Sequence, residues 1–193
     1  MSGLGSINLT NQFLIAMPGM ADDHFAGSVV YLCEHTERGA LGLVISKPID
    51  ITIANLFERV EMALDREDLA AVPVHFGGPV QTERGFVLHD RPADDAAAYA
   101  SSLLVPGGLA MTTSRDVLEA LSGGNGPRRV LITLGYAGWG AGQLEDELSR
   151  NGWLTVDADP AIIFDTPAEQ RYQRALSLLG IDPAFLAQEA GHA

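Results

Sequence analysis

Hydrophobic residues along this chain gather mainly in short runs bounded by glycine, proline or charged residues. Runs of this kind that are rich in β-branched residues are typical of strands. The run at 130–134 (VLITL) is almost continuously apolar and predicts a strand covered on both faces, in the middle of a sheet. The other predicted strands are 12–16, 29–34, 40–46, 74–77, 85–89, 99–104, 109–112, 153–156 and 161–164.

Short turns separate 29–34 from 40–46 and 74–77 from 85–89, so each of these two pairs predicts a hairpin. In a symmetric second hairpin, His75 lies opposite Phe86, and the strict alternation of a strand then places His89 on the other face. The two histidines are therefore not expected to share a metal ion.

Apolar residues recur at helical spacing after three residues that are predicted to cap helices: Thr52, Ser114 and Thr166. The third helix start is strengthened by Pro167 at the first helical position. Further helices are predicted after Gly142 and, as a short final element, from Asp182. The buried stripe of the helix after Thr166 is predicted at Tyr172, Leu176 and Leu179. Strands in the first two thirds and helices in the last third predict an α+β fold with a mixed sheet.

The length of 193 residues predicts one domain spanning 1–193, with residues 1–10 and 190–193 fraying at its ends. The single cysteine, Cys33, excludes an internal disulfide framework and a multi-cysteine metal cluster, which favours a reducing cytoplasm. The sequence carries no signal peptide and no apolar run of about 20 residues, so we expect a soluble protein without a membrane partner.

The net charge is −13, from 25 acidic and 12 basic residues. A protein that binds phosphates of nucleic acid needs a clustered basic face, and an acidic excess of this size opposes the approach of DNA. The densest basic pair, Arg128 and Arg129, is interpreted as the solvated start of a strand. Direct nucleic-acid binding, and with it the hypothesis of a transcriptional regulator, is disfavoured.

The rest of the chain is organised around residues 130–153, which predict a buried strand, a turn rich in glycine at 135–142 and a helix. This layout binds phosphates when the helix N-terminus is free. Here the glycine motif of phosphate loops is absent, and Glu145, Asp146 and Glu147 already occupy the first helical turns. We therefore expect the turn to pack against the core, with Trp139 as its buried plug.

A small-molecule site at this turn is kept as an alternative hypothesis. Its walls would be the 138–140 turn and the turn at 77–79. Gln143 shares one helix face with Glu147 and could hydrogen-bond a neutral ligand. The candidate ligand-binding residues are Gly77, Gly78, Gly138, Trp139, Gly140 and Gln143.

Two residues apart on one predicted strand, Cys33 and His35 are expected to leave the same face, which raises the question of a thiolate–imidazole pair. No cation or helix start flanks Cys33 to lower the pKa of its thiol. A buried and unreactive cysteine is the favoured interpretation. The sequence shows no catalytic motif, and we predict no catalytic residues, no metal site and no cofactor.

Several blocks, in order, resemble the YqgE/AlgH family of bacterial proteins over nearly the whole chain. They are residues 11–18 (NQFLIAMP), 28–35 (SVVYLCEH), 39–48 (GALGLVISKP), 77–80 (GGPV) and 135–139 (GYAGW) leading into 142–145 (GQLE). Ser46 stands where the family pattern has asparagine. The resemblance implies an α+β fold whose largely antiparallel sheet is bent into a partly open barrel with helices around it. It also implies a link to the regulation of alginate production, and it brings no catalytic residues.

The sequence thus favours a non-enzymatic cytoplasmic protein that acts in regulation by binding a protein or a small metabolite. One alternative is an enzyme or small-molecule-binding protein with a pocket near the 138–140 turn. The other is a transcriptional regulator, against which the charge argues.

Overall fold

The computed structural model describes residues 8–17, 27–91 and 99–180. The ten strands in these ranges are β1 (Gln12–Ala16), β2 (Val29–Thr36), β3 (Gly39–Val44), β4 (Pro48–Thr52), β5 (Pro73–Phe76), β6 (Val80–Asp90), β7 (Ser102–Val105), β8 (Leu109–Thr112), β9 (Val130–Gly140) and β10 (Trp153–Asp157). The helices are α1 (Ile53–Arg59), α2 (Glu67–Ala70), α3 (Asp116–Ser122), α4 (Gln143–Ser149), α5 (Pro160–Phe164) and α6 (Ala168–Leu178). The predicted α+β class is confirmed.

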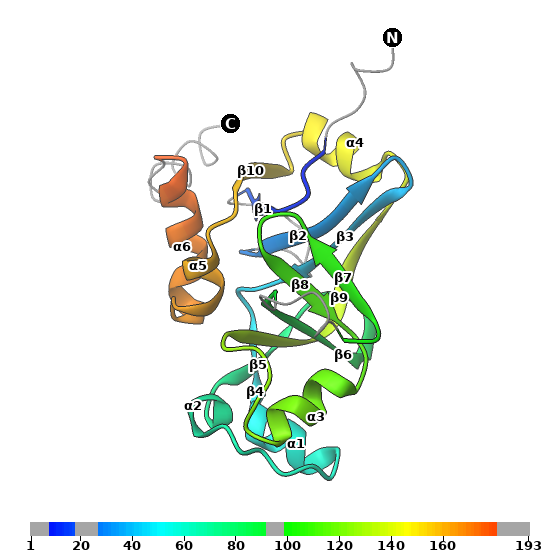
Figure 1. The fold of residues 1–193 in the computed structure, drawn as a ribbon. Helices are drawn as coiled ribbons and strands as arrows, with labels where there is room; N and C mark the ends of the chain where they lie inside the picture. The colour runs from blue at the N-terminus through cyan, green and yellow to red at the C-terminus, as the bar shows by residue number, and fades with distance from the viewer. Residues whose placement is uncertain (1–7, 18–26, 92–98, 181–193) are drawn as a thin grey trace.

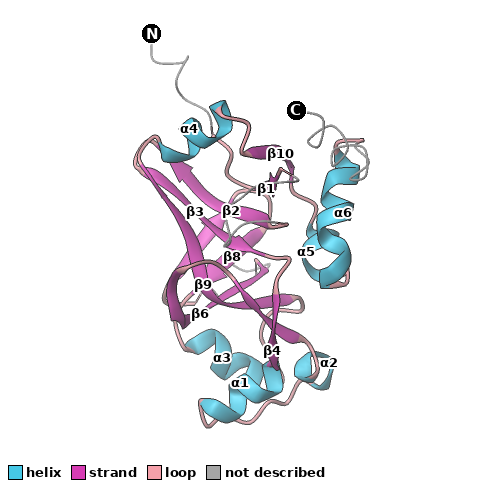
Figure 2. Cartoon of the chain, turned by 180° about the vertical axis from the view of Figure 1, so that it is seen from behind, coloured by secondary structure: helices cyan, strands magenta, loops and turns pink. Residues whose placement is uncertain are grey.

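The strands form one sheet in the order β10-β1-β2-β3-β9-β6-β8-β7, which curls into a half-barrel. Every pairing along this path is antiparallel, and β5 joins β9 from the side as a parallel neighbour. Figure 1 shows the helices at the periphery, with α4 at one end of the sheet, α1 to α3 at the other and α5 and α6 beside it; Figure 2 shows the same arrangement from behind.

Strand β9 is the centre of this sheet, but its extent differs from the prediction. The expected turn at 135–142 is largely strand, because β9 continues to Gly140 and only residues 141 and 142 turn before α4. Along one edge β9 pairs with β6, and along the other it changes partner, from β5 at Thr133 and Leu134 to β3 at 137–140. Gly135 has φ +82°, where a side chain is strained, and it bends the strand at this change of partner.

Three hydrophobic clusters hold the sheet and helices together. The first lies inside the half-barrel, where side chains of β1 to β3 meet those of β6 to β9 and are covered by α5 and α6. The second lies under α4, on the other face of β1 to β3 and the end of β9. The third lies under α1 and α3, on β5, β6 and β9. The sheet is thus covered by helices in three separate places.

Several predicted elements are corrected by the structure. Residues 161–164 belong to helix α5, which Asp159 caps and Pro160 begins, rather than to a strand. The predicted hairpin of 74–77 with 85–89 is wrong, because β5 pairs with β4 and β9 instead of β6. Strand β4 was not predicted.

The helix starts and the chain ends also differ in part. Thr52 caps α1 as predicted. Ser114 and Thr166 do not cap the helices that follow them, since their hydroxyls donate to Asp116 Oδ1 and Ala161 O. Leu179, predicted to be buried, is 36% exposed. Within residues 1–10, predicted to fray, Leu9 is buried. The helix predicted from Asp182 and the end at 190–193 lie outside the described residues.

Within the described ranges, no helix combines the length and the apolar character that a membrane span requires.

Candidate functional site

The two glycines of the 77–79 turn pack directly against the bend of β9. A Cβ on Gly77 would overlap Gly135 O and Thr133, and one on Gly78 would overlap the backbone of Tyr136. Hydrogen bonds fix the turn, since Gly77 N donates to Leu134 O at 2.9 Å and Val44 N donates to Gly77 O at 2.8 Å. The turn therefore fills the joint where β9 passes from β5 to β3, and its glycines allow this close approach.

The two tryptophans meet at the side of α4. The rings of Trp139 and Trp153 pack edge to face with centroids 6.1 Å apart, and both are nearly buried. Both indole N–H groups donate to one carboxylate oxygen, Glu147 Oε1, at 3.0 and 2.8 Å. Gln143 completes this tryptophan cluster: its Nε2 donates to Glu147 Oε2 at 3.1 Å, and its Oε1 accepts from Gly140 N at 3.0 Å.

The predicted candidate residues therefore lie in two neighbouring groups along β9 and α4. Gly77 and Gly78 lie at the bend of β9, and Gly138, Trp139 and Gly140 lie along the second half of that strand. Gln143 is the first residue of α4. Trp139 and Gln143 are engaged within the protein, as the packing interpretation requires. Ligand binding by the six residues stays a prediction.

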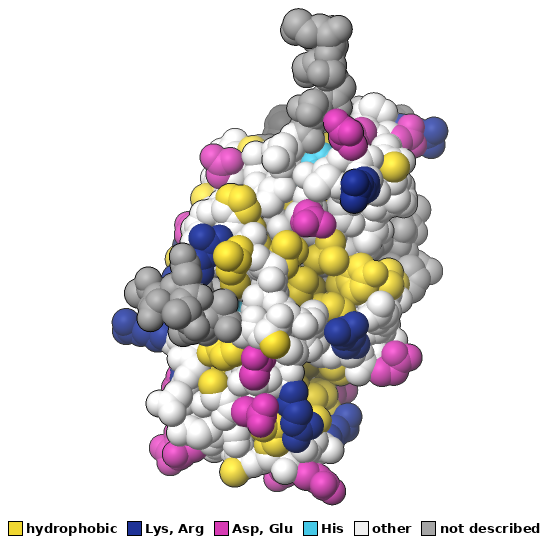
Figure 3. All heavy atoms as spheres, turned by 45° about the vertical axis from the view of Figure 1, so that its right-hand side comes forward, with side chains coloured by type: hydrophobic (Ala, Val, Ile, Leu, Met, Phe, Trp, Pro, Cys, Tyr) yellow, Lys and Arg dark blue, Asp and Glu magenta, His cyan; other side chains and the backbone are white. Residues whose placement is uncertain are grey.

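A shallow hollow of about 380 Å³ lies beside Gly138 on the other side of the sheet from the tryptophan cluster. Residues of β2, β3, β6 and β9 line it, among them Glu34, Arg38, Leu41 and Tyr136. Figure 3 turns the side of the molecule that carries β3, β6, β7 and β9 in Figure 1 toward the reader, and hydrophobic side chains gather at its centre with charged side chains around them. This hollow is wide open to solvent, which weakens the hold on a small ligand.

Cys33 and His35 do not share a face, which corrects the prediction. A β-bulge between Leu32 and Glu34 shifts the register of β2 against β3, so the alternation of side chains is reversed at Cys33. Cys33 points into the half-barrel, where burial raises the pKa of its thiol. His35 lies beneath α4: its Nδ1 accepts from Leu9 N, and its Nε2 lies 3.3 Å from Glu145 Oε2.

His75 and His89 lie on opposite faces, as predicted, although the hairpin from which this was derived does not exist. Residue 133 of β9 is the register partner of both His75 and Phe86, which puts those two on one face and His89 on the other. His75 Nε2 accepts from Arg171 Nη1 at 3.0 Å, and Arg171 also donates to Ile45 O. Burial, with a smaller effect of Arg171, lowers the pKa of His75 to about 4.

His89 belongs to a buried chain of hydrogen bonds that could not be predicted from the sequence. Its Nδ1 lies 2.7 Å from Asp90 O, so this nitrogen carries the proton and Nε2 accepts from Thr112 Oγ1 at 2.7 Å. Thr112 Oγ1 in turn accepts from Ser102 Oγ at 2.7 Å. This arrangement resembles a nucleophile and its base, but Thr112 is 0% exposed, so its hydroxyl is closed to solvent although the residue borders the pocket between α1 and α3.

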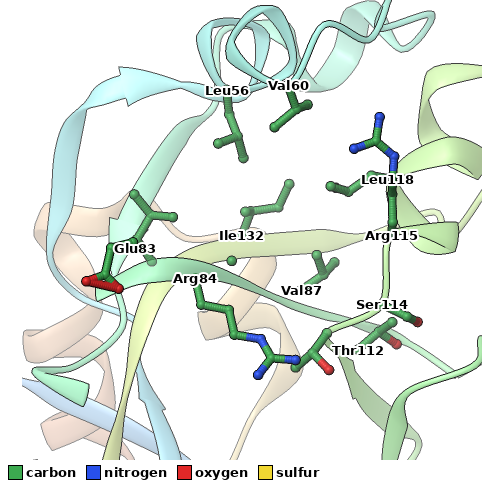
Figure 4. A pocket seen from close by; sticks show the side chains of 13 residues that line it. Leu56, Val60, Glu83, Arg84, Val87, Thr112, Ser114, Arg115, Leu118 and Ile132 are labelled. Carbon is green, nitrogen blue, oxygen red and sulfur yellow. The ribbon is translucent and has the colours of Figure 1, made fainter. Parts of the chain in front are cut away.

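A second pocket, more enclosed than the hollow beside Gly138, lies between α1, α3 and the sheet and has a volume of about 240 Å³. Figure 4 shows its apolar side chains around an open centre: Leu56 comes from α1 and Val60 directly follows that helix, Leu118 comes from α3, and Val87 and Ile132 come from the sheet. Polar residues of the β8–α3 connection and of β6 form the rim. An apolar interior with a few polar groups at the edge is the usual composition of a small-molecule site.

Gly85 makes this pocket possible. It lies in β6 at the pocket, and a Cβ there would meet no atom within 4 Å. Its φ is not in the left-handed region, so the backbone does not require glycine. Gly85 also lies at the end of the register shift of β6 against β9, where glycine is common, and its missing side chain leaves space above Val87 and Ile132.

The sequence profile of a family described as AlgH-like matches residues 13–184. The chain belongs to the AlgH-like family. A UPF0301 protein of Cupriavidus metallidurans is 68% identical over 187 residues, covering 97% of this chain and 96% of the relative. A UPF0301 protein of Ralstonia pickettii is 67% identical with the same coverage.

Two solved structures resemble this fold. The solution structure of the AlgH protein from Pseudomonas aeruginosa has a TM-score of 0.77 and 50% identity, with 98% of each chain covered. A protein from Corynebacterium diphtheriae has a TM-score of 0.69 at 20% identity, covering 88% of this chain and 86% of the other, and this likeness shows the fold alone. The resemblance to the YqgE/AlgH family and the half-barrel it implied are both confirmed.

Sequence reasoning about this AlgH-like chain missed the pocket between α1 and α3. Its lining comes from four segments that are far apart in the sequence, and its apolar residues were interpreted only as parts of separate helices and strands. Gly85 lies inside strand β6, but the predicted strand began at this residue, so the glycine did not stand out in the sequence. The pocket of this AlgH-like chain therefore becomes visible only when the fold brings the four segments together.

Proposed function

We propose that this protein is a non-enzymatic cytoplasmic regulator that acts by binding another molecule, and that the pocket between α1, α3 and the sheet is its binding site. The open space at Gly85 carries this proposal, since an unfilled apolar volume on a well-packed sheet loses contacts that a ligand would supply. The regulatory part rests on the resemblance to the YqgE/AlgH family, which implies a link to regulation.

The size of the pocket supports a small ligand or a single apolar group of a larger one. A cavity of about 150 Å³ lined by apolar residues holds benzene, and this pocket is larger. Each CH₂ group buried contributes about 0.8 kcal/mol, so a body of five or six such groups contributes about 4 kcal/mol. This corresponds to a Kd of about 1 mM before any polar contact adds to it.

The proposal is tested by titrating the protein with benzene and indole and following methyl groups by NMR. We expect shifts confined to Leu56, Val60 and Leu118, and we expect Gly85→Val to abolish them without lowering stability, because its methyl groups occupy the open space. Thr155→Val is the control, since it places a valine in strand β10, away from the pocket, and should leave the shifts unchanged.

Shifts at Leu41 and Val80 instead would favour the hollow beside Gly138 and the alternative hypothesis that places the site there. Turnover of a bound molecule that is lost in Gly85→Val would show the protein to be an enzyme. Absence of any shift at millimolar probe would overturn the proposed site.

A further inference from the structure

The pocket between α1 and α3 has ends of opposite charge. Figure 4 shows Glu83 at one side of the opening and Arg115 at the other, with the apolar side chains of Leu56, Val60 and Ile132 between them. A ligand that fills the apolar centre and carries a charge therefore meets different partners at its two ends. The sign of the charge that it prefers depends on which end has an unused partner.

The charged group that is available to a ligand is the guanidinium of Arg115. In the described part of the chain, its guanidinium makes no hydrogen bond and no ion pair, whereas Arg66 and Arg129 each bind an aspartate at 2.9 Å. The neighbouring Asp116 does not neutralise it directly, because its carboxylate oxygens accept from Ser114 Oγ and Ala100 N. Arg115 thus keeps its donors at the mouth of the pocket.

Thr113 supports an anion at the Arg115 end of the pocket, and Glu83 disfavours an anion at the opposite end. Thr113, which also lines the pocket, has a hydroxyl without a hydrogen bond among the described residues, so it can donate beside Arg115. Arg84 is already engaged, since its guanidinium lies 5.9 Å from the centre of the Phe86 ring and 3.4 Å from Gln81 Oε1. Glu83 repels an anion from the opposite end, which fixes the orientation of a charged ligand.

We propose that the pocket selects a small apolar molecule that carries one carboxylate, with its hydrocarbon body over Ile132 and its carboxylate at Arg115. A planar guanidinium binds a carboxylate through two parallel hydrogen bonds, which suits this end better than an alcohol or an ammonium. This inference rests on the proposed function of the same pocket and adds to it the chemical class of the ligand.

The test compares three six-carbon probes, hexanoate, hexan-1-ol and hexylamine, by NMR titration of the wild-type protein at low salt. We expect hexanoate to bind about 5- to 10-fold more tightly than hexan-1-ol, the range of a partly exposed charged contact, and hexylamine to bind most weakly. The preference for hexanoate should shrink with added salt, because the contact is at the surface.

Variants at Arg115 and Gly85 separate the contribution of the ligand's carboxylate from that of its hydrocarbon body. Arg115→Gln should reduce hexanoate affinity to that of hexan-1-ol and leave hexan-1-ol within about twofold, and Arg115→Lys should retain part of the preference. Gly85→Val should abolish binding of all three probes.

Equal affinity for hexanoate and hexan-1-ol in the wild-type protein would overturn the carboxylate inference and leave the proposed binding site standing. An unchanged hexanoate preference in Arg115→Gln would do the same. Failure of all three probes, together with failure of benzene and indole, would overturn the proposed site itself.

Discussion

Replacement of Glu147 is the sharpest test of how the region 130–153 works. One carboxylate oxygen of Glu147 accepts from the indoles of Trp139 and Trp153, and the other accepts from Gln143. A hydrogen bond to a charged group contributes about 1.5–3 kcal/mol when it is buried. Because Glu147 is only half-buried, we expect Glu147→Ala to reduce the free energy of unfolding by about 2–3 kcal/mol for the two indole contacts.

Two further variants grade the effect of the carboxylate. Glu147→Gln keeps an acceptor oxygen and loses only the charge, so we expect a loss of about 1 kcal/mol. Gln143→Ala removes contacts that are exposed to solvent, and we expect about 0.5 kcal/mol or less. The geometry of the cluster thus predicts that the cost decreases from Glu147→Ala to Glu147→Gln and then to Gln143→Ala.

Intrinsic fluorescence reports on this cluster alone, because the chain has only two tryptophans and both belong to it. We would measure urea unfolding by fluorescence and by far-UV circular dichroism, which follows the whole chain. Glu147→Ala should shift the emission of the native protein to longer wavelength, as both indoles lose their partner. A cost below about 0.5 kcal/mol with unchanged emission would refute the view that Glu147 organises the tryptophans.

Four further predictions concern the core and the joint of the sheet. The pKa of His75 is lowered to about 4, so the free energy of unfolding is unaffected by this histidine above about pH 6.5, where it is neutral in both states. Between about pH 6.5 and 4 the free energy of unfolding should fall by about 3 kcal/mol, because the unfolded chain binds the proton more readily than the folded one. His75→Gln should flatten the pH dependence of urea unfolding in that window. Arg171→Met leaves Ile45 O without its donor and should lower Tm by several degrees. Gly78→Ala should cost about 3 kcal/mol or prevent folding, because its Cβ overlaps backbone atoms of Tyr136, which the yield of soluble protein and Tm would show. Alkylation of Cys33 in the native protein should be slow at neutral pH, and fast labelling detected by mass spectrometry would contradict its burial.

The sequence predicted strands well where apolar runs were compact and poorly where glycine interrupted them. The run at 130–134 was recognised, but the six residues after it, with three glycines, were interpreted as a turn. Glycine makes a strand difficult to distinguish from a turn in the sequence, because a turn and a strand closely approached by its neighbours both require a small residue. Only the positions of Gly77 and Gly78 against β9 decide between them.

Helix α5 illustrates a local conflict that the sequence did contain. Residues 161–164 are apolar and β-branched enough to suggest a strand, yet Asp159 and Pro160 form a helix start of the kind that was recognised elsewhere in the chain. Side-chain direction was harder still. One inserted residue at Cys33 reverses the alternation of β2, so the expectation that Cys33 and His35 share a face was wrong although both lie in β2.

The candidate pocket is the feature that sequence reasoning could least provide, and Gly85 explains why. Its φ is not positive and a Cβ on it would meet nothing within 4 Å, although it lies at the end of the register shift of β6 against β9. A valine there would suit the strand, since strands favour β-branched residues. If stability alone determined this position, glycine would be the poorer choice. The open space is what the proposed binding site requires, and a stabilised Gly85→Val protein that retains its biological activity would count directly against that site.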